Sequence, residues 1–305
     1  MKKAALHNLG CKVNAYETEA MQQLLEEAGY EIVSFVQEAD VYVINTCSVT
    51  NMADRKSRQM VHRARRQNPN AIVIAAGCYV QTAPKDLIKD GMADIILGNN
   101  KKKNLISVLE EYQRNIRLPA EPEESPSSRE AAADLENKQK SQKPVIDYED
   151  LNHGKKEYEQ LSLTKTVQHT RAFIKIQDGC SQFCSYCIIP YARGRVRSRQ
   201  PEDVLSEIRS LAEAGYKEVV LTGIHLSSYG IDFEGSSTGL LQLIENVHRI
   251  EGIRRIRLGS LEPGIITEEF ASALAGMEKI CPHFHLSLQS GCDTVLRRMN
   301  RRYDT

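Results

Sequence analysis

The sequence predicts an α/β protein with two consecutive series of strands and helices. In residues 1 to about 113, short β-branched runs alternate with amphipathic stretches that have the helical period. A second series with the same alternation begins at residue 171. Alternation of this kind is typical of parallel sheets covered by helices. We therefore predict a doubly wound parallel sheet followed by a partial β/α barrel.

The first series places cysteines directly after its predicted strands. Strands are expected at 4–10, 31–35, 41–45, 71–77 and 94–98, and helices at 15–28, 51–67 and 101–114. In parallel sheets, functional groups gather in the crevice beyond the carboxyl ends of the strands. Cys11, Cys47 and Cys78, the strand-end cysteines, each follow a predicted strand by one to three residues. We expect all three at this crevice.

Between the two series, the composition changes to one that cannot form a core. Residues 119–143 contain no aromatic and no β-branched residue, and Pro, Ser and charged residues dominate. Such a stretch buries too little apolar surface to order itself. We therefore expect a first domain at 1–116, a flexible linker at 117–165 and a second domain at 166–305.

The second series contains four β/α units. Strands are expected at 171–177, 217–223, 254–260 and 283–289, and helices at 201–214, 239–250, 267–276 and 292–300. A barrel of this kind normally needs about six to eight such units to bury the faces of its strands. The second domain is therefore expected to be truncated at its C-terminal end, with an unpaired edge on its last strand. A fragment of this kind is expected to be inactive or poorly folded on its own.

Charge and hydropathy exclude several classes of protein. The 305 residues include 40 basic and 40 acidic side chains, so any nucleic-acid surface must be local. The longest apolar runs, such as 71–77, are far shorter than the ~20 residues of a membrane span. His7 and Asn8 interrupt the apolar start, so no signal-peptide core forms. We expect a cytoplasmic protein with no membrane contact.

The cysteines point to metal chemistry. Eight cysteines without a secretion signal favour metal or redox sites over disulfides. Three of them have the spacing C-x3-C-x2-C directly after a predicted strand; these loop cysteines are Cys180, Cys184 and Cys187. Three thiolates can bind three corners of a 4Fe–4S cluster and leave the fourth iron free for a substrate. The alternative is a structural zinc site, with His169 or His225 as a fourth ligand, but the paired C-x2-C units typical of zinc are absent.

With Tyr186 between the second and third loop cysteines, the motif resembles that of the radical S-adenosylmethionine superfamily. The resemblance implies that the open iron binds S-adenosylmethionine, which is split to methionine and a 5′-deoxyadenosyl radical that abstracts hydrogen. It also implies that the backbone at Tyr186 contacts the adenine. Gly223 and Gln289 follow predicted strands and are expected to bind the cofactor, with turn geometry and packing as the alternative.

Six sequence blocks resemble the methylthiotransferase family in order and over almost the whole chain. They are LGCKVNAYETEA, VINTCSVTNMADRKSRQ, AAGCYVQ, DGCSQFCSYCIIPYARGRVRSR, LTGIH and LQSGCDTVLRRMNRR. The resemblance implies a second 4Fe–4S cluster on the strand-end cysteines, in a reducing compartment. It also implies two S-adenosylmethionine molecules per turnover, one methylating sulfur and one supplying the radical. No catalytic residue beyond the cluster ligands is expected. The resemblance also leads us to expect that the family's further barrel strands and its small β-rich, TRAM-like tRNA-binding domain are absent from this chain.

The first block favours one branch of the family. Its residues Lys12, Val13, Asn14, Tyr16 and Glu17 resemble the branch that acts on N6-threonylcarbamoyladenosine at position 37 of tRNA, adding a methylthio group to carbon 2. The alternatives are isopentenyladenosine in tRNA, ribosomal protein S12, or a non-catalytic iron–sulfur or RNA-binding module. An electron donor and a sulfur source are implied as partners, and the sequence identifies neither of them, nor the oligomeric state.

Two groups of basic residues are candidates for RNA contact. Arg193, Arg195, Arg197 and Arg199 alternate after the loop cysteines, so in an extended segment they would project to one side and bind tRNA phosphates. The alternative is pairing with acids or with the carboxylate of S-adenosylmethionine. The second group lies on the predicted helix 51–67 and comprises Arg55, Lys56, Arg58, Arg63, Arg65 and Arg66. The alternative to RNA contact is a basic face that is simply exposed to solvent.

Overall fold

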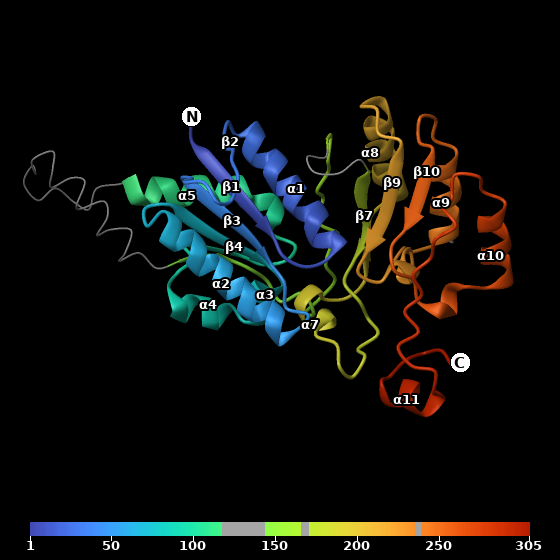
Figure 1. The fold of residues 1–305 in the computed structure, drawn as a ribbon. Helices are drawn as coiled ribbons and strands as arrows, with labels where there is room; N and C mark the ends of the chain where they lie inside the picture. The colour runs from blue at the N-terminus through green and yellow to red at the C-terminus, as the bar shows by residue number, and fades with distance from the viewer. Residues whose placement is uncertain (118–143, 166–170, 236–238) are drawn as a thin grey trace, which may run out of the picture. The chain divides into compact units, whose positions relative to one another are not determined.

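The computed structural model describes residues 1–117, 144–165, 171–235 and 239–305 (Figure 1). Two compact units form. The first unit contains Met1–Gly10 and Met21–Glu149, and the second contains Cys11–Ala20 and Asp150–Thr305. The strand-end cysteine Cys11 therefore belongs to the second unit, whereas a simple division between the two series would assign it to the first.

The first unit is built on a parallel sheet with the strand order β2-β1-β3-β4-β5-β6. The strands are β1 (Lys3–Asn8), β2 (Glu31–Ile32), β3 (Val41–Thr46), β4 (Ile72–Gly77), β5 (Ile95–Leu97) and β6 (Val145–Asp147). Every residue of β3 and β4 is buried, as expected for central strands covered on both faces. The predicted strand at 31–35 is reduced to the two residues of β2.

Helices cover both faces of this sheet, as the doubly wound prediction requires. They are α1 (Lys12–Glu27), α2 (Asn51–Gln67), α3 (Cys78–Thr82), α4 (Pro84–Asp90), η1 (Lys102–Asn104) and α5 (Leu105–Arg117). Apolar side chains of α2, α3 and α4 pack on one face, and those of α5 and the second half of α1 pack on the other (Figure 1). Helix α2 has the predicted bounds because Thr50 caps it: its Oγ1 accepts a hydrogen bond from the amide of Ala53 at 3.1 Å.

The predicted linker at 117–165 is wrong for its last part. Strand β6 extends the first sheet by pairing in parallel with β5. Further along, the side chains of Leu151, Leu161 and Leu163 are buried. A few apolar residues are enough here because an added strand is held by backbone hydrogen bonds to its neighbour. Residues 118–143 of the predicted linker lie outside the described residues, as do 166–170.

The second unit contains a mixed sheet with the strand order β10-β9-β7-β8. Its strands are β7 (Ala172–Asp178), β8 (Arg197–Ser198), β9 (Glu218–Gly223) and β10 (Arg255–Leu258), and only β8 among them runs antiparallel to its neighbour. Its helices are α7 (Ile189–Arg193), α8 (Pro201–Glu213), η2 (Leu226–Ser228), α9 (Leu240–His248), η3 (Pro263–Ile265), α10 (Glu268–Ala275) and α11 (Asp293–Arg298). One apolar core joins β7, β9 and β10 to α8, α9 and α10.

The fourth predicted strand of the second series, at 283–289, does not form a ladder. Its backbone makes an isolated bridge between Leu261 and Leu286, and the side chains of Leu286 and Leu288 are exposed. The alternating pattern that predicted a strand therefore does not bury an apolar face in this structure. In the part of the chain that the structure describes, no helix combines the length and the apolar character needed to cross a membrane.

Candidate metal centre

The loop cysteines follow the fully buried strand β7, and a glycine sets the path of the chain between them. Gly179 has φ of 71°, and a Cβ atom there would lie 2.0 Å from the carbonyl oxygen of Arg195. This approach lets the amide of Cys180 donate to the carbonyl of Gly194 at 2.9 Å. Only glycine fits at this position, because any side chain would collide with backbone. The strand end and Gly179 together place Cys180 at the carboxyl edge of the second sheet.

The three loop thiols form a set that favours a bound cation. Cys184 is buried, and Cys180 and Cys187 are half-buried, with the amide of Cys187 donating to the carbonyl of Cys184 at 3.0 Å. Burial, together with the neighbouring cysteines, raises the pKa of Cys180 to about 11, and burial and Cys184 also raise the pKa of Cys187. Since thiolates are the ligating form, positive charge is needed to stabilise them together. The donor set therefore fits an iron–sulfur cluster.

Among the residues that the structure describes, no three Cys, His, Asp or Glu side chains are gathered closely enough to hold a single metal ion. The three ligands of a 4Fe–4S cluster bind different iron atoms, so they need not meet at one ion. His225, the candidate fourth zinc ligand, is hydrogen-bonded instead to Ser228 at 2.6 Å and to Glu262 at 2.9 Å. His169 lies outside the described residues.

A chain of polar contacts reaches the loop from the C-terminal segment. Arg301 Nη1 donates to Cys184 Sγ at 3.2 Å, and Arg301 Nη2 pairs with Glu262 Oε1 at 2.9 Å. Burial opposes ionisation of Glu262, but its contacts with His225 and Arg301 hold the pKa of its carboxyl below the usual range. Sequence reasoning missed both Arg301 and Glu262. The sequence feature that could have pointed to Glu262 is its position shortly after a strand of the second sheet, β10.

The three residues predicted to bind S-adenosylmethionine lie in different surroundings. Tyr186 is 54% exposed in the cysteine loop. Gly223 ends β9, where a Cβ atom would lie 2.9 Å from Gln177 Oε1, so its small size permits close packing on β7. Gln289 is exposed and has φ of 68°. Cofactor binding by these three residues stays a prediction.

In the first unit, strand register brings two strand-end cysteines to neighbouring strand ends. Thr46, the last residue of β3, pairs with Gly77, the last residue of β4. Cys47 and Cys78 come next in the sequence and are both buried. The hydroxyl of Ser57 on α2 accepts from the amide of Cys47 at 3.2 Å and donates to its carbonyl at 3.0 Å. The sequence-based expectation that these two cysteines share one edge of the sheet is met by this register.

Two buried polar side chains beside Cys78 were not predicted. Asn99 Nδ2 donates to Cys78 Sγ at 3.6 Å, and Lys102 Nζ donates to Asn99 Oδ1 at 2.6 Å. Both side chains are fully buried. These contacts hold the side chain of Asn99 in place beside the sulfur of Cys78. The position of both residues after β5, at the same edge of the sheet, was the signal that could have found them.

Cys11 opens helix α1 in the second unit. Its side chain is exposed, and its carbonyl accepts from the amide of Ala15 at 3.0 Å, which forms the first helical turn. Cys11 Sγ is also 3.9 Å from Asn14 Oδ1. The backbone of Cys11 is therefore fixed by the start of a helix, while its sulfur stays accessible.

The expectation that four arginines project to one side for RNA contact is wrong for three of them. Arg193, Arg197 and Arg199 are buried. Their guanidinium groups pair with the carboxylates of Glu17, Asp178 and Glu207. The alternative of pairing with acids therefore holds for these three. Arg195 is exposed and stacks on the ring of Phe183, with 4.5 Å between its guanidinium carbon and the ring centroid.

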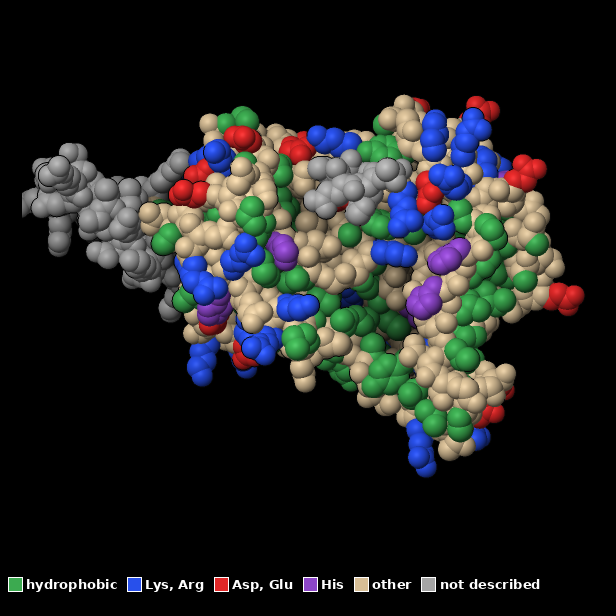
Figure 2. Space-filling view, in the orientation of Figure 1, with side chains coloured by type: hydrophobic (Ala, Val, Ile, Leu, Met, Phe, Trp, Pro, Cys, Tyr) green, Lys and Arg blue, Asp and Glu red, His purple; other side chains and the backbone are tan. Residues whose placement is uncertain are grey.

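The basic helix α2 has a largely exposed charged face. Arg65 is an exception because it pairs with Asp94 at 2.5 Å and donates to backbone carbonyls. The remaining basic side chains are exposed and comprise Arg55, Lys56, Arg58, Arg63 and Arg66. Figure 2 shows Lys and Arg side chains over the part of the first unit that carries α2. One end of this face is close to the cysteine site, since Arg58 donates to the hydroxyl of Tyr79, the residue after Cys78, at 2.9 Å.

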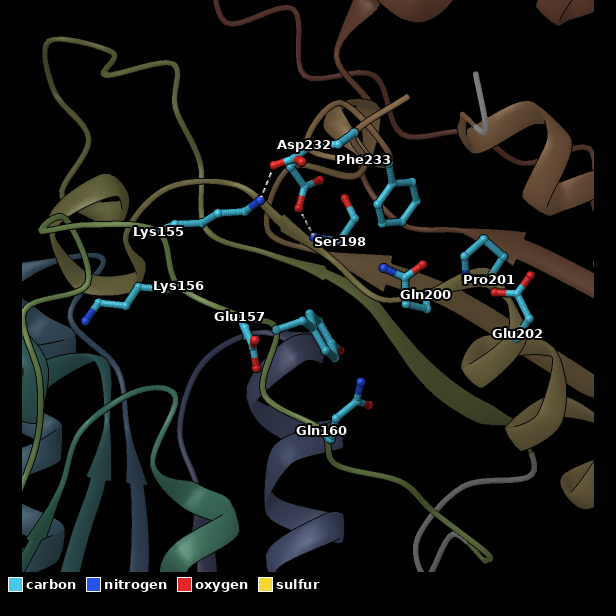
Figure 3. Close-up of a pocket in the computed structure, with 12 residues that line it drawn as sticks. Lys155, Lys156, Glu157, Gln160, Ser198, Gln200, Pro201, Glu202, Asp232 and Phe233 are labelled. Atoms are coloured by element: carbon cyan, nitrogen blue, oxygen red, sulfur yellow. Dashed lines mark hydrogen bonds and ion pairs between the residues drawn. The ribbon is translucent and has the colours of Figure 1, made fainter. Parts of the chain in front are cut away.

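The second unit also contains a polar pocket of about 600 Å³ (Figure 3). Its wall includes Lys155, Gln200 and Asp232, and Asp232 accepts a hydrogen bond from the amide of Ser198 at 2.8 Å. Lys155 pairs with Glu234 at its exposed rim. None of the predicted site residues lines this pocket. We assign no ligand to it.

Two family models match the chain. The model described as "Uncharacterized protein family UPF0004" matches residues 3–98, and the model described as "Radical SAM superfamily" matches residues 174–305. The two cluster motifs predicted from the sequence fall inside these two matches. Cys11, Cys47 and Cys78 lie in the first, and the loop cysteines lie in the second.

Curated relatives match nearly the whole chain. A threonylcarbamoyladenosine tRNA methylthiotransferase MtaB of Bacillus subtilis (strain 168) is 43% identical over 99% of this chain and 61% of its own length. The MtaB of Aquifex aeolicus (strain VF5) is 40% identical over 99% of this chain and 66% of its own length. A tRNA-2-methylthio-N(6)-dimethylallyladenosine synthase of Thermoanaerobacter sp. (strain X514) is 31% identical over 98% of this chain and 58% of its own length. The chain thus spans less than two thirds of these relatives.

Solved structures share the fold. The radical S-adenosylmethionine methyltransferase TsrM from Kitasatospora setae, in complex with tryptophan and a SAM analogue, matches with a TM-score of 0.61. The match covers 100% of this chain and 63% of that chain, at 16% sequence identity. At this identity the likeness concerns the fold alone. It confirms the predicted α/β class, with a parallel sheet followed by a second sheet of the radical-SAM type.

Proposed function

Because the chain joins a UPF0004 domain to a Radical SAM domain and its relatives are methylthiotransferases, we propose that it is a tRNA-modifying methylthiotransferase with two 4Fe–4S clusters. The observation that carries the proposal is the placement of cysteines at strand ends in both units. The loop cysteines follow β7, and Cys47 and Cys78 follow the paired strands β3 and β4.

The loop cysteines would hold the cluster that binds S-adenosylmethionine. When bound, the cluster and S-adenosylmethionine together would supply a radical able to abstract hydrogen from an unactivated carbon. The chain's own residues shape the site: Gly179 sets the path of the loop, and Arg301 donates to the sulfur of Cys184. Arg301 thus compensates part of the negative charge of three thiolates. Tyr186, Gly223 and Gln289 remain our candidates for contacts with S-adenosylmethionine.

The strand-end cysteines would hold the second cluster, which provides sulfur. Asn99, held in place by Lys102, contacts the sulfur of Cys78, and Ser57 fixes the backbone of Cys47. Such groups around a metal ligand orient it and raise its affinity for metal. A second S-adenosylmethionine would methylate the transferred sulfur. An electron donor and a sulfur source complete the set of partners.

We propose N6-threonylcarbamoyladenosine at position 37 of tRNA as the substrate, with the methylthio group added to carbon 2. Relatives named for this substrate are 34 to 43% identical to the chain, and relatives named for dimethylallyladenosine are 31% identical. The dimethylallyl substrate is therefore the second candidate. The exposed basic side chains of α2, together with Arg195, are the proposed contacts with tRNA phosphates. We also propose a location in the reducing cytoplasm, which would suit thiolate-bound iron and a tRNA substrate.

Iron counting after anaerobic reconstitution tests the two-cluster proposal. Replacing all three loop cysteines with Ala is expected to remove about four irons, and replacing all three strand-end cysteines is expected to remove about four others. Cys281 and Cys292 provide a matched control, since neither follows the cluster spacing. Protein that binds zinc and no iron under these conditions would refute the proposal.

Mass spectrometry of tRNA nucleosides tests the substrate. Cells with an intact gene are compared with cells that lack it. Loss of the 2-methylthio form of threonylcarbamoyladenosine alone supports the proposed substrate. Loss of the 2-methylthio form of dimethylallyladenosine supports the second candidate, and a change confined to a ribosomal protein would contradict both.

A further inference from the structure

Three polar residues of the first block that favoured one family branch, Asn14, Tyr16 and Glu17, are buried, whereas Lys12 is exposed. Glu17, on the second turn of α1, is fully buried. Its Oε1 accepts from Lys175 Nζ at 2.7 Å and from Arg193 Nη1 at 2.8 Å. Lys175 lies on β7 and Arg193 ends α7. The carboxylate therefore joins the start of α1 to the strand and the helix on either side of the cysteine loop.

The same arginine extends the connection at both ends. Arg193 Nη2 donates to Asn14 Oδ1 at 2.6 Å, on the first turn of α1. Arg193 Nη1 also pairs with Asp178 Oδ1 at 3.0 Å, and that oxygen accepts from the amide of Gly179 at 2.8 Å. A continuous series of hydrogen bonds thus leads from Asn14 to the backbone that precedes Cys180. Cys11 is three residues before Asn14, at the start of the same helix.

A second set of contacts holds the next face of the helix. The hydroxyl of Tyr16 donates to the carbonyl of Leu161 at 2.6 Å and lies 3.2 Å from Glu207 Oε1. Glu207 also pairs with Arg199 and accepts from the amide of Leu163 at 2.7 Å. The polar residues of the first two turns of α1 therefore contact the second unit, and this agrees with the assignment of Cys11–Ala20 to that unit.

The buried ion pairs around Glu17 and Arg193 form a network that is stable only in precise geometry. Buried charges destabilise a protein unless each one is well paired. Its members are almost fully excluded from solvent: the cations Lys175, Arg193 and Arg197 pair with the carboxylates of Glu17 and Asp178. Apolar residues would hold a helix against a sheet without this requirement. Charged pairs add specificity, because they are satisfied in only one arrangement of the helix against the sheet. Buried polar groups fix the register of coiled coils in the same way.

We propose that Asn14 and Glu17 are positioning residues that, within the second unit, hold the start of helix α1 and with it Cys11 in a fixed position relative to Cys180. The proposal rests on the proposed function in taking Cys11 as a cluster ligand. These side chains act through Arg193 and Asp178, and none of them contacts a substrate. The first block is thereby assigned to the internal geometry of the enzyme, and RNA recognition is assigned to other residues.

Retention of iron by the strand-end cysteines tests the proposal. The full chain carries Ala at all three loop cysteines, so that only the strand-end site binds iron. In this background, Glu17→Gln is expected to release iron to a chelator about tenfold faster, because groups that orient a metal ligand contribute 10- to 100-fold to metal affinity. Glu27→Gln makes the same charge change at an exposed position of α1 and is expected to leave the rate unchanged.

A double-mutant cycle separates positioning from general destabilisation. Arg193→Gln alone is expected to accelerate release, and the double variant Glu17→Gln with Arg193→Gln is expected to release iron no faster than either single variant, since both act on one contact. All rates are measured well below the unfolding temperature of each variant. Equal release from Glu17→Gln and the parent, or strictly multiplicative effects of the two substitutions, would overturn the proposal.

The outcomes distinguish this inference from the proposed function. If the parent with intact strand-end cysteines binds no iron, the proposed function fails. If the parent binds about four irons and Glu17→Gln retains them equally well, only the positioning role fails. A milder variant, Asn14→Ala, removes no charge but removes the contacts of Asn14 Oδ1 with Arg193 and with Cys11 Sγ, and it is expected to accelerate release less than Glu17→Gln. It keeps the test decisive if Glu17→Gln does not fold.

Discussion

The guanidinium of Arg193 donates to both carboxylate oxygens of Glu17, at 2.8 and 3.1 Å, and neither side chain reaches solvent. The two residues are separated by 176 positions in the sequence. Bidentate pairing of this kind fixes distance and orientation together. It accounts for the inclusion of the start of α1 in the second unit, and it removes Arg193 from any surface that could meet RNA.

Replacing Arg193 is expected to destabilise the protein strongly. Arg193→Met leaves Glu17 and Asp178 buried with fewer cations, which should cost about 3–5 kcal/mol in the free energy of unfolding. Arg195→Met changes an exposed residue whose stacking on Phe183 contributes about 0.5–1 kcal/mol. Urea unfolding followed by circular dichroism measures both. Similar losses for the two variants would contradict the assignment of Arg193 to the interior.

Gly179→Ala is expected to disrupt the cysteine loop. The added Cβ atom would lie 2.0 Å from the carbonyl oxygen of Arg195, in addition to the cost of its positive φ. We expect a loss of about 3–5 kcal/mol and failure of the loop cysteines to bind iron. Gly215→Ala isolates the backbone cost, since Gly215 has φ of 98° and open space around it, and should cost about 1 kcal/mol. Iron binding unaffected by Gly179→Ala would contradict the described loop path.

Stability is expected to fall as the pH rises through the titration range of Glu19. Burial raises the pKa of this carboxyl from about 4.5 to about 7. The folded state therefore binds more protons than the unfolded state between these values, and the stabilisation that the protonated form provides is lost as the pH increases from about 4.5 to 7. Glu19→Gln should remove this slope and stabilise the protein at pH 8 by about 1–2 kcal/mol, after allowance for solvent screening.

Thermal and urea unfolding at pH 5, 6, 7 and 8 measure this effect. Glu27→Gln, at an exposed position of the same helix, serves as the control and should leave the slope in place. A pH profile that is the same for Glu19→Gln and the parent would show that another group is responsible.

The exposed face of α2 is expected to contribute to tRNA affinity through phosphates. Replacing Arg55 and Arg63 with Gln should weaken binding and lower the slope of log affinity against log salt concentration by about 1–2. Replacing Arg209 on α8 and Arg249, the residue directly after α9, removes the same charge from the second unit. This control pair should change the slope little. Filter binding across a salt series measures both, and equal slopes for the two variants would argue against α2 as the RNA contact.

Several features were determined by short stretches of sequence. The spacing of Cys180, Cys184 and Cys187 predicts the cluster loop, because three ligands within eight residues need no long-range information. The hydrophobic period likewise predicted the strands of the first sheet. The position of Cys47 and Cys78 directly after two of these strands predicted that both cysteines lie at the same edge of the sheet. The bounds of α2 were predicted because a capping residue and a helical period are local signals.

The partners of charged side chains were decided only by the tertiary structure. Arg193, Arg197 and Arg199 have the pattern of a solvent-facing row, yet carboxylates from distant segments bury them. The prediction of a strand at 283–289 was also wrong because of tertiary structure. An alternating pattern forms a ladder only where a neighbouring strand pairs with its backbone, and this segment makes only an isolated bridge. Composition and period report what a segment can bury. The path of the whole chain decides which residues a segment contacts. The pairing of Glu17 with Arg193 could therefore not be predicted from either segment alone.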